Sequence, residues 1–184
     1  MIFVILGTQD KSFERLLNKI EELKKQKIIK DDIVVQSGYT KYNSKIMSIF
    51  DYLPMNEFEN YINKADLIIT HGGAGSILGS LKKNKKVIAV PRLSKYGEHT
   101  NDHQLQIVKE LANDGYILSC LDLNELGHVI EKSKDFIPKK YVPDNKRVVD
   151  TINNYIEKSN NYNKSIIYIL VFLLCILLII FFVF

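Results

Sequence analysis

The residues that most clearly suggest chemistry are three glycines in the segment HGGAGS, at positions 71–76. They follow the apolar run Leu67–Thr70, which is typical of a buried parallel strand, and Ser76 opens a helical pattern that continues to Leu81. Glycine lets backbone N–H groups approach an anion closely, and the positive end of a helix dipole attracts the same charge. The segment therefore predicts a turn that binds nucleotide phosphates through Gly72, Gly73, Ala74, Gly75 and Ser76.

Two common phosphate-binding fingerprints are missing from the sequence. It contains no GxxxxGK[ST] with its lysine, and no GxGxxG followed about twenty residues later by an acid for the ribose. The sequence therefore disfavours a kinase, an ATPase or a simple dehydrogenase.

Two further polar segments follow predicted strands. Gly7, Thr8 and Gln9 come after the first apolar run, and YGEHTNDHQ, at 96–104, comes after VIAVP. Ligands of parallel α/β sheets bind outside the carboxyl ends of the strands. All three segments are therefore expected at one edge of the sheet, with the last one facing a sugar.

Several of these residues have two interpretations. His71 either donates to a phosphate or sugar oxygen or hydrogen-bonds the backbone of its turn. Asp102 either positions a sugar hydroxyl or caps the helix that runs on from His103. His99 and His103 have the i, i+4 spacing of zinc ligands, but no third ligand or HExxH accompanies them, so no metal site is expected.

The pattern of apolar residues predicts a doubly wound parallel α/β sheet, because strands alternate with helices. Strands are expected near 2–6, 32–36, 46–50, 66–70, 87–90 and 116–119, and helices near 12–27, 55–64, 75–83, 102–113, 123–132 and 145–158. Residues 1–157 would form one domain, and the asparagine-rich residues 158–164 a linker. The net charge of +4 comes from scattered lysines without the aromatic pattern of an RNA-binding module, so nucleic acid is not expected as a partner.

Residues 165–184 are uncharged and apolar and are predicted to be a transmembrane helix. About 20 residues at 1.5 Å each span a bilayer core of roughly 30 Å. Lys158 and Lys164 precede this segment, which predicts a cytoplasmic N-terminal domain by the positive-inside rule. Met1 leads directly into the first strand, so no signal peptide is expected. A disulfide between Cys120 and the intramembrane Cys175 is not expected either.

Taken together, the three motifs resemble the donor-binding half of GT-B glycosyltransferases of the MurG type, the glycosyltransferase family 28 C-terminal domain. They resemble more closely the small catalytic subunits of two-component transferases. The likeness runs through residues 1 to about 150, in MIFVILGTQDKSFERLL, THGGAGS and PRLSKYGEHTNDHQ. One such subunit, with a membrane partner, builds the GlcNAc-GlcNAc lipid of N-glycosylation, and PssE-like bacterial counterparts act in capsule or exopolysaccharide assembly.

The resemblance implies a role for each motif. Gly7, Thr8 and Gln9, with His71 and the glycines after it, would bind UDP, while the hexose would face Glu98, Asn101, Asp102, His103 and Gln104. Many relatives hold the ribose with a glutamate on the helix after the glycines, whereas this chain has Gly79 at the corresponding position.

The implied activity is an inverting, metal-independent hexosyl transfer without a cofactor. The donor would be UDP-galactose, UDP-GlcNAc or UDP-glucuronate, and the acceptor a lipid-diphosphate-linked sugar. A complete GT-B enzyme has two facing domains, so a membrane-associated partner would supply the acceptor half and the general base, with His71 as the candidate in this chain. Two alternatives stay open: a non-catalytic, membrane-tethered subunit that binds UDP-sugar, and an interaction domain without a ligand.

Overall fold

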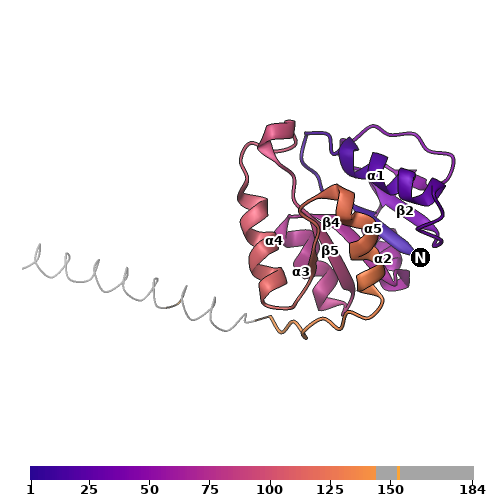
Figure 1. Cartoon of the computed structure of the whole chain (residues 1–184). Helices are drawn as coiled ribbons and strands as arrows, with labels where there is room; N and C mark the ends of the chain where they lie inside the picture. The colour runs from indigo at the N-terminus through magenta and orange to yellow at the C-terminus, as the bar shows by residue number, and fades with distance from the viewer. Residues whose placement is uncertain (144–152, 154–184) are drawn as a thin grey trace, which may run out of the picture. The chain divides into compact units, whose positions relative to one another are not determined.

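A computed structural model describes residues 1–143 and 153, and residues Met1–Val142 form one compact α/β unit (Figure 1). Its strands are β1 (Ile2–Ile5), β2 (Ile33–Gln36), β3 (Ser48–Phe50), β4 (Leu67–His71), β5 (Lys86–Val90) and β6 (Leu118–Ser119). Its α-helices are α1 (Glu14–Lys25), α2 (Met55–Lys64), α3 (Ala74–Lys82), α4 (His103–Asn113) and α5 (Leu126–Ser133). Two short 3₁₀ helices, η1 (Ser94–Tyr96) and η2 (Leu123–Glu125), complete the elements.

All described strand pairs are parallel, in the order β3-β2-β1-β4-β5-β6. The strand order reverses between β1 and β4, which pair from Ile2 with Leu67 to Ile5 with Thr70. At such a reversal the two following loops leave the sheet in opposite directions and open a crevice at the carboxyl ends of the strands. The loops after β1 and β4 therefore flank the position where a doubly wound sheet binds its ligand.

Alternation along the strands divides the core into two layers. In β1, Ile2 and Val4 belong to the cluster that also contains the buried residues of α1 and α5, whereas Phe3 and Ile5 face buried residues of α2, α3 and α4. Both faces of the sheet are covered by helices, and the central strands accordingly carry apolar residues on both faces (Figure 1). This packing fixes the strand ends and leaves the loops to carry polar chemistry.

The predicted fold class and the order of its elements are confirmed through residue 133, with bounds that differ by a few residues. The predicted helix near 145–158, the linker 158–164 and the transmembrane segment 165–184 lie outside the described residues, apart from residue 153. Among the residues that the structure does describe, no helix has the length and apolar character needed to cross a membrane.

Candidate functional site

A cavity of about 470 Å³ opens at the carboxyl ends of β1 and β4, at the point where the strand order reverses. The predicted site residues among its lining are Gly7, Thr8, His71, Gly75 and Ser76. The structure therefore brings the first loop, residues 6–13, and the glycine turn, residues 71–76, to one cavity. Gln9, Gly72, Gly73 and Ala74 belong to the same two segments but do not line it.

The His71 ring occupies the space between the two segments. Gly7 has a left-handed φ of 76°, and a Cβ on it would lie 2.5 Å from His71 Cε1. A Cβ on Gly73 would collide with His71 Nε2. Glycine is thus required on both sides of the imidazole, at Gly7 by conformation as well as by space.

The hydrogen bonds of His71 place a proton on Nδ1. Nδ1 lies 3.3 Å from the Ile5 carbonyl oxygen, which can only accept. The Thr70 hydroxyl donates its single proton to the same oxygen at 2.9 Å, so it cannot also donate to Nδ1. Burial lowers the pKa of His71 to about 4. The imidazole is therefore a weak general base at neutral pH, and its bond to Ile5 shows that it does contact backbone, on the neighbouring strand.

The first turn of α3 offers backbone donors to the cavity. Its N-cap residue, Gly73, has no side chain, and no capping hydrogen bond is made there. The first N–H groups of a helix have no acceptor within the helix, and the dipole makes this end positive. A Cβ on Gly75 would meet no atom within 4 Å, so the approach to these N–H groups is open. This end of α3 can bind a phosphate without a cationic side chain.

An apolar wall completes the cavity and was not predicted from the sequence. It consists of Tyr52, Leu53, Met55 and Phe58, from the β3–α2 connection and the first turns of α2. Tyr52 is half exposed and makes an edge-to-face contact with Tyr39, with ring centroids 6.2 Å apart. The Gln36 side chain accepts a hydrogen bond from Leu53 N at 3.1 Å and so holds this connection. Such a wall beside a phosphate site suits the flat face of a nucleobase.

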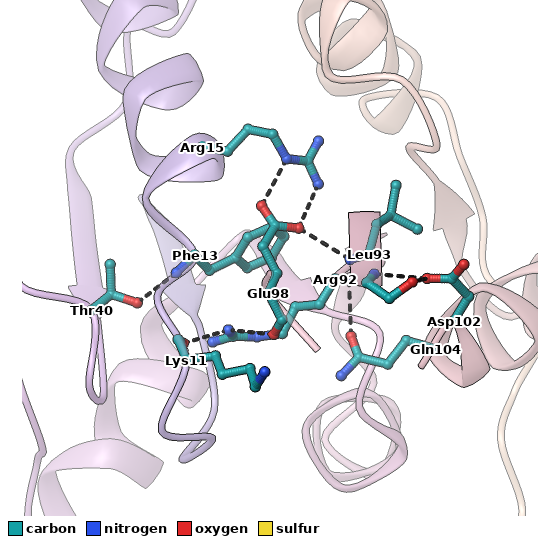
Figure 2. Close-up of polar contacts among 10 residues, drawn as sticks. Lys11, Phe13, Arg15, Thr40, Arg92, Leu93, Glu98, Asp102 and Gln104 are labelled. Carbon is teal, nitrogen blue, oxygen red and sulfur yellow. Dashed lines mark hydrogen bonds and ion pairs between the residues drawn. The ribbon is translucent and has the colours of Figure 1, made fainter. Parts of the chain in front are cut away.

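Glu98 is the clearest departure from the sequence-based prediction. Its side chain does not line the cavity but is buried, with 3% of its surface exposed. Its carboxylate accepts from Arg15 Nε at 2.8 Å, from Arg15 Nη2 at 2.9 Å and from Leu93 N at 3.1 Å (Figure 2). Because these bonds use the carboxylate internally, the structure gives Glu98 a role in holding the chain rather than a free face for a sugar.

Gln104 also acts within the protein. It is buried, and its Oε1 accepts from Gly72 N at 3.0 Å and from Arg92 N at 3.1 Å. A single side chain on α4 therefore links the glycine turn to the end of β5. The sequence-based prediction placed Gln104 among the sugar-facing residues, because contacts of Gln104 with the backbone of Gly72 and Arg92 are not visible in the sequence.

The exposed residues around the start of α4 differ in whether their side-chain polar groups are already used within the protein. Asp102 occupies the N-cap position of α4 but makes no capping bond; its Oδ1 accepts from Ser94 N at 2.8 Å and Ser94 Oγ at 2.9 Å. The Ser94 N–H bond holds the pKa of Asp102 below its usual value. Asn101 Oδ1 accepts from His103 N at 3.1 Å, which leaves the Asn101 amide NH₂ and the exposed His103 ring available to a ligand.

The sequence predicts no metal site, and the structure bears on this prediction only for the residues that it describes. Within residues 1–143 and 153, no group of three or more His, Cys, Asp and Glu side chains is arranged to hold a metal ion. His99 instead accepts from Asn101 N at 3.3 Å through Nδ1.

Comparison with known families now gives the site its context. A model of the glycosyltransferase family 28 C-terminal domain matches residues 1–159, most of the chain. The chain belongs to this family. Its six-stranded parallel sheet is accordingly the Rossmann-like C-terminal half of a GT-B glycosyltransferase, and the glycine turn and first loop lie at the cavity of that half.

Among curated proteins, this family 28 domain is similar to UDP-N-acetylglucosamine transferase subunit ALG13 from several organisms. The human protein is 31% identical over 132 residues, which cover 65% of this chain and 11% of that protein. The Candida glabrata protein is 34% identical over 106 residues, which cover 56% of this chain and 49% of that protein. The chain thus spans about a tenth to about half of the length of these relatives.

Solved structures support the fold. The NMR solution structure of ALG13 superposes with a TM-score of 0.53 at 21% identity, covering 79% of this chain and 91% of that one. The crystal structure of the glycosyltransferase of kitacinnamycin superposes with a TM-score of 0.54 at 16% identity, covering 72% of this chain and 35% of that one. The second structure is about three times as long as the shared region, as expected where one chain also contains other parts.

Proposed function

We propose that this chain is the donor-binding, catalytic subunit of a two-component GT-B glycosyltransferase. It would transfer a hexose from UDP-galactose, UDP-GlcNAc or UDP-glucuronate to a lipid-diphosphate-linked sugar, in glycolipid or in PssE-like capsule and exopolysaccharide assembly. The observation that carries the proposal is the cavity where the strand order reverses between β1 and β4. There the uncapped start of α3 adjoins the apolar wall. Membership of family 28 and likeness to a UDP-N-acetylglucosamine transferase subunit support the same donor class.

The cavity suggests how the donor binds. The diphosphate would accept from N–H groups at the start of α3, with the Ser76 hydroxyl and Thr8 as further donors. The uracil would lie against Tyr52, Met55 and Phe58. The hexose would extend toward Asn101 and His103, the residues of the predicted sugar loop whose donor groups remain available.

The transfer itself would be an inverting displacement in which the acceptor hydroxyl attacks the anomeric carbon and UDP leaves. The helix end and the backbone donors would stabilise the charge that develops on the departing diphosphate. His71 is a poor candidate for the general base, because burial lowers its pKa to about 4. We therefore propose that the base, like the acceptor-binding half, comes from a membrane-associated partner subunit.

Radiolabelled transfer tests this function directly. Membranes that co-express this chain with a candidate acceptor-binding GT-B half would be supplied with each UDP-sugar, and labelled lipid would be extracted. Transfer only when both proteins are present is expected. A matched control uses the pair with Gly75→Leu in this chain, whose side chain would enter the cavity and should abolish the transfer. Transfer by the partner alone would contradict the catalytic role.

A second candidate function is a non-catalytic subunit that binds UDP-sugar and regulates assembly. Gly79 favours it, because this position lacks the ribose-binding glutamate of many relatives. UDP binding measured by calorimetry, together with no transfer from any donor in the presence of the partner, would select this alternative over the enzyme.

We further propose that residues 165–184 anchor the chain as a single-pass membrane protein with its N-terminal domain in the cytoplasm. An uncharged segment of this length supports the proposal. Flotation of the full chain with liposomes, compared with a chain that ends at residue 157, tests it. Equal flotation of both would contradict the anchor.

A further inference from the structure

Arg92 connects the segments that form the donor cavity, although it does not line the cavity itself. Only 1% of its surface is exposed. It lies two residues after the end of β5, and its guanidinium lies over the ring of Phe13, 4.9 Å from the ring centroid (Figure 2). A buried arginine after a central strand is uncommon, because an arginine side chain is seldom fully buried without a partner that compensates its charge.

The contacts of Arg92 are with main-chain oxygens of two loops. Nη2 donates to Leu6 O at 2.8 Å, and Nη1 donates to Lys11 O at 2.6 Å and to Glu98 O at 3.3 Å. Leu6 and Lys11 bracket Gly7, Thr8 and Gln9, so one guanidinium holds the main chain on both sides of these three residues. The same group fixes Glu98, whose carboxylate holds Arg15 on α1.

The main chain of Arg92 extends the connection to the glycine turn. Its N–H shares Gln104 Oε1 with Gly72 N. The first loop, the glycine turn and the polar loop, residues 93–104, therefore meet at one residue. A displaced guanidinium is therefore expected to shift the first loop relative to the start of α3.

Fold stability alone is a poor reason for this arrangement. Burial lowers the pKa of Arg92 to about 10, and its Nε has no hydrogen-bond partner within the described residues. Buried charges and unpaired donors cost free energy, and an apolar side chain of similar volume is often as stable or more so. An apolar side chain has no donor, however, and could not hold the three carbonyls to which Arg92 donates.

We propose that Arg92 is a positioning residue for the donor diphosphate: it sets the first loop and the glycine turn at the separation that lets both bind one ligand. This inference rests on the proposed function and goes beyond it, because it assigns diphosphate affinity to a residue that does not touch the ligand. Binding of the nucleoside part, which depends on the wall at Tyr52, Met55 and Phe58, is not set by Arg92.

The test compares UDP with uridine on the full chain in detergent micelles, by titration calorimetry at a temperature where every variant is folded. Arg92→Met is expected to weaken UDP binding roughly tenfold or more, about 1.4 kcal/mol, while uridine affinity changes less than about twofold. Arg92→Lys should lie between, because an ammonium lacks the fork that reaches three carbonyls. Amide hydrogen exchange of residues 6–12 should rise in Arg92→Met.

A matched control separates positioning from stability. Leu23→Ala removes a buried side chain at the end of α1 farther from the cavity and should lower the melting temperature without changing UDP affinity. Unchanged UDP affinity in both arginine variants, or equal losses for UDP and uridine, would overturn the positioning role and leave the proposed function intact. Absence of UDP binding by the wild-type chain would instead overturn the proposed function, and this inference with it.

Discussion

The glycine turn and the polar loop lie at the same edge of the sheet, yet they use their polar groups in opposite ways. In the glycine turn the start of α3 has no capping side chain, and Gly75 faces open space. In the polar loop the carboxylates of Glu98 and Asp102 and the amide oxygen of Gln104 all accept bonds from their own chain. The first segment keeps donors available to a ligand, and the second uses acceptors to hold the backbone.

The difference shows that polarity alone does not identify a ligand contact. Family 28 membership directs attention to both segments, but only the one with unsatisfied backbone donors can gain much from an anion. The polar loop contributes indirectly, because its Gln104 holds the glycine turn, while Arg92, the residue before the loop, holds the first loop. Under the proposed function, the glycine turn binds the diphosphate and the polar loop mainly positions the binding segments.

The strongest test of this division changes Gly75 to leucine. Its Cβ would meet no protein atom within 4 Å, and leucine favours a helix over glycine, so stability should be kept or raised. The side chain would nevertheless enter the space where the diphosphate is proposed, and UDP affinity should fall roughly hundredfold, about 2.7 kcal/mol. Calorimetric titration with UDP and a thermal melt measure the two quantities.

Gly79→Ala is the control for that substitution. It adds a methyl group to the same helix one turn later, also in open space, and should leave UDP affinity within about twofold. If Gly75→Leu binds UDP as tightly as Gly79→Ala, the start of α3 is not the diphosphate site. The glycine turn and the polar loop would then not differ in ligand binding.

A second test uses the pH dependence of stability, since His71 is a half-buried titratable group of the glycine turn. Its pKa falls from 6.5 to about 4 on folding because burial disfavours the charged ring. Between these values the unfolded chain binds a proton that the folded chain does not, so stability is full above pH 6.5 and is lost as the pH falls toward 4. The loss should be on the order of 3 kcal/mol.

Urea unfolding of the wild type and of His71→Asn at several pH values measures this contribution. The asparagine amide can still donate to Ile5 O but does not titrate, so its stability should vary less between pH 7 and pH 4 by that amount. Parallel curves for the two proteins would mean that the ring is solvated, and that the segment is more open than the described contacts indicate.

The fold was largely predictable, because its signals are local. Strands such as Leu67–His71 are apolar on both faces and alternate with amphipathic helices, which leaves few alternatives to a doubly wound parallel sheet. The glycine turn was also predictable, since a strand, three glycines and a helix start form one continuous segment. Gly7 and His71 were found by their positions after strands, although their mutual contact was not.

The rest of the site depends on contacts between distant residues, which the sequence cannot show. Glu98 pairs with Arg15, 83 positions away, and Arg92 reaches Leu6 across 86 positions. A polar residue after a strand therefore has the same appearance in the sequence whether it faces a ligand or its own backbone. A signal for Arg92 did exist, namely a single arginine directly after the apolar run VIAVP.

A smaller effect is expected in the polar loop. Asp102→Ala removes the acceptor of Ser94 N and Ser94 Oγ and should lower the melting temperature only slightly, because the side chain is exposed. The ratio of the affinities for UDP and for a UDP-hexose should stay constant, because the side chain holds the loop rather than the sugar. A changed ratio would restore the sugar contact that the sequence suggested, and would bring the two segments closer in function.

The smallest expected effect restores a side chain that this chain lacks. Gly79 follows Gly75 by one helical turn, and a Cβ there meets nothing within 4 Å, so Gly79→Glu should fold and extend toward the ribose of a nucleotide bound at the helix start. A new hydrogen bond to ribose would tighten UDP binding by a few-fold, roughly 0.5–1.5 kcal/mol. Deoxygenated UDP that lacks both ribose hydroxyls is the matched ligand and should gain nothing. An equal gain in affinity for both ligands would point to charge or helix propensity. A loss for both would mean that the carboxylate approaches the diphosphate. The nucleotide would then lie farther along α3 than the glycine turn implies.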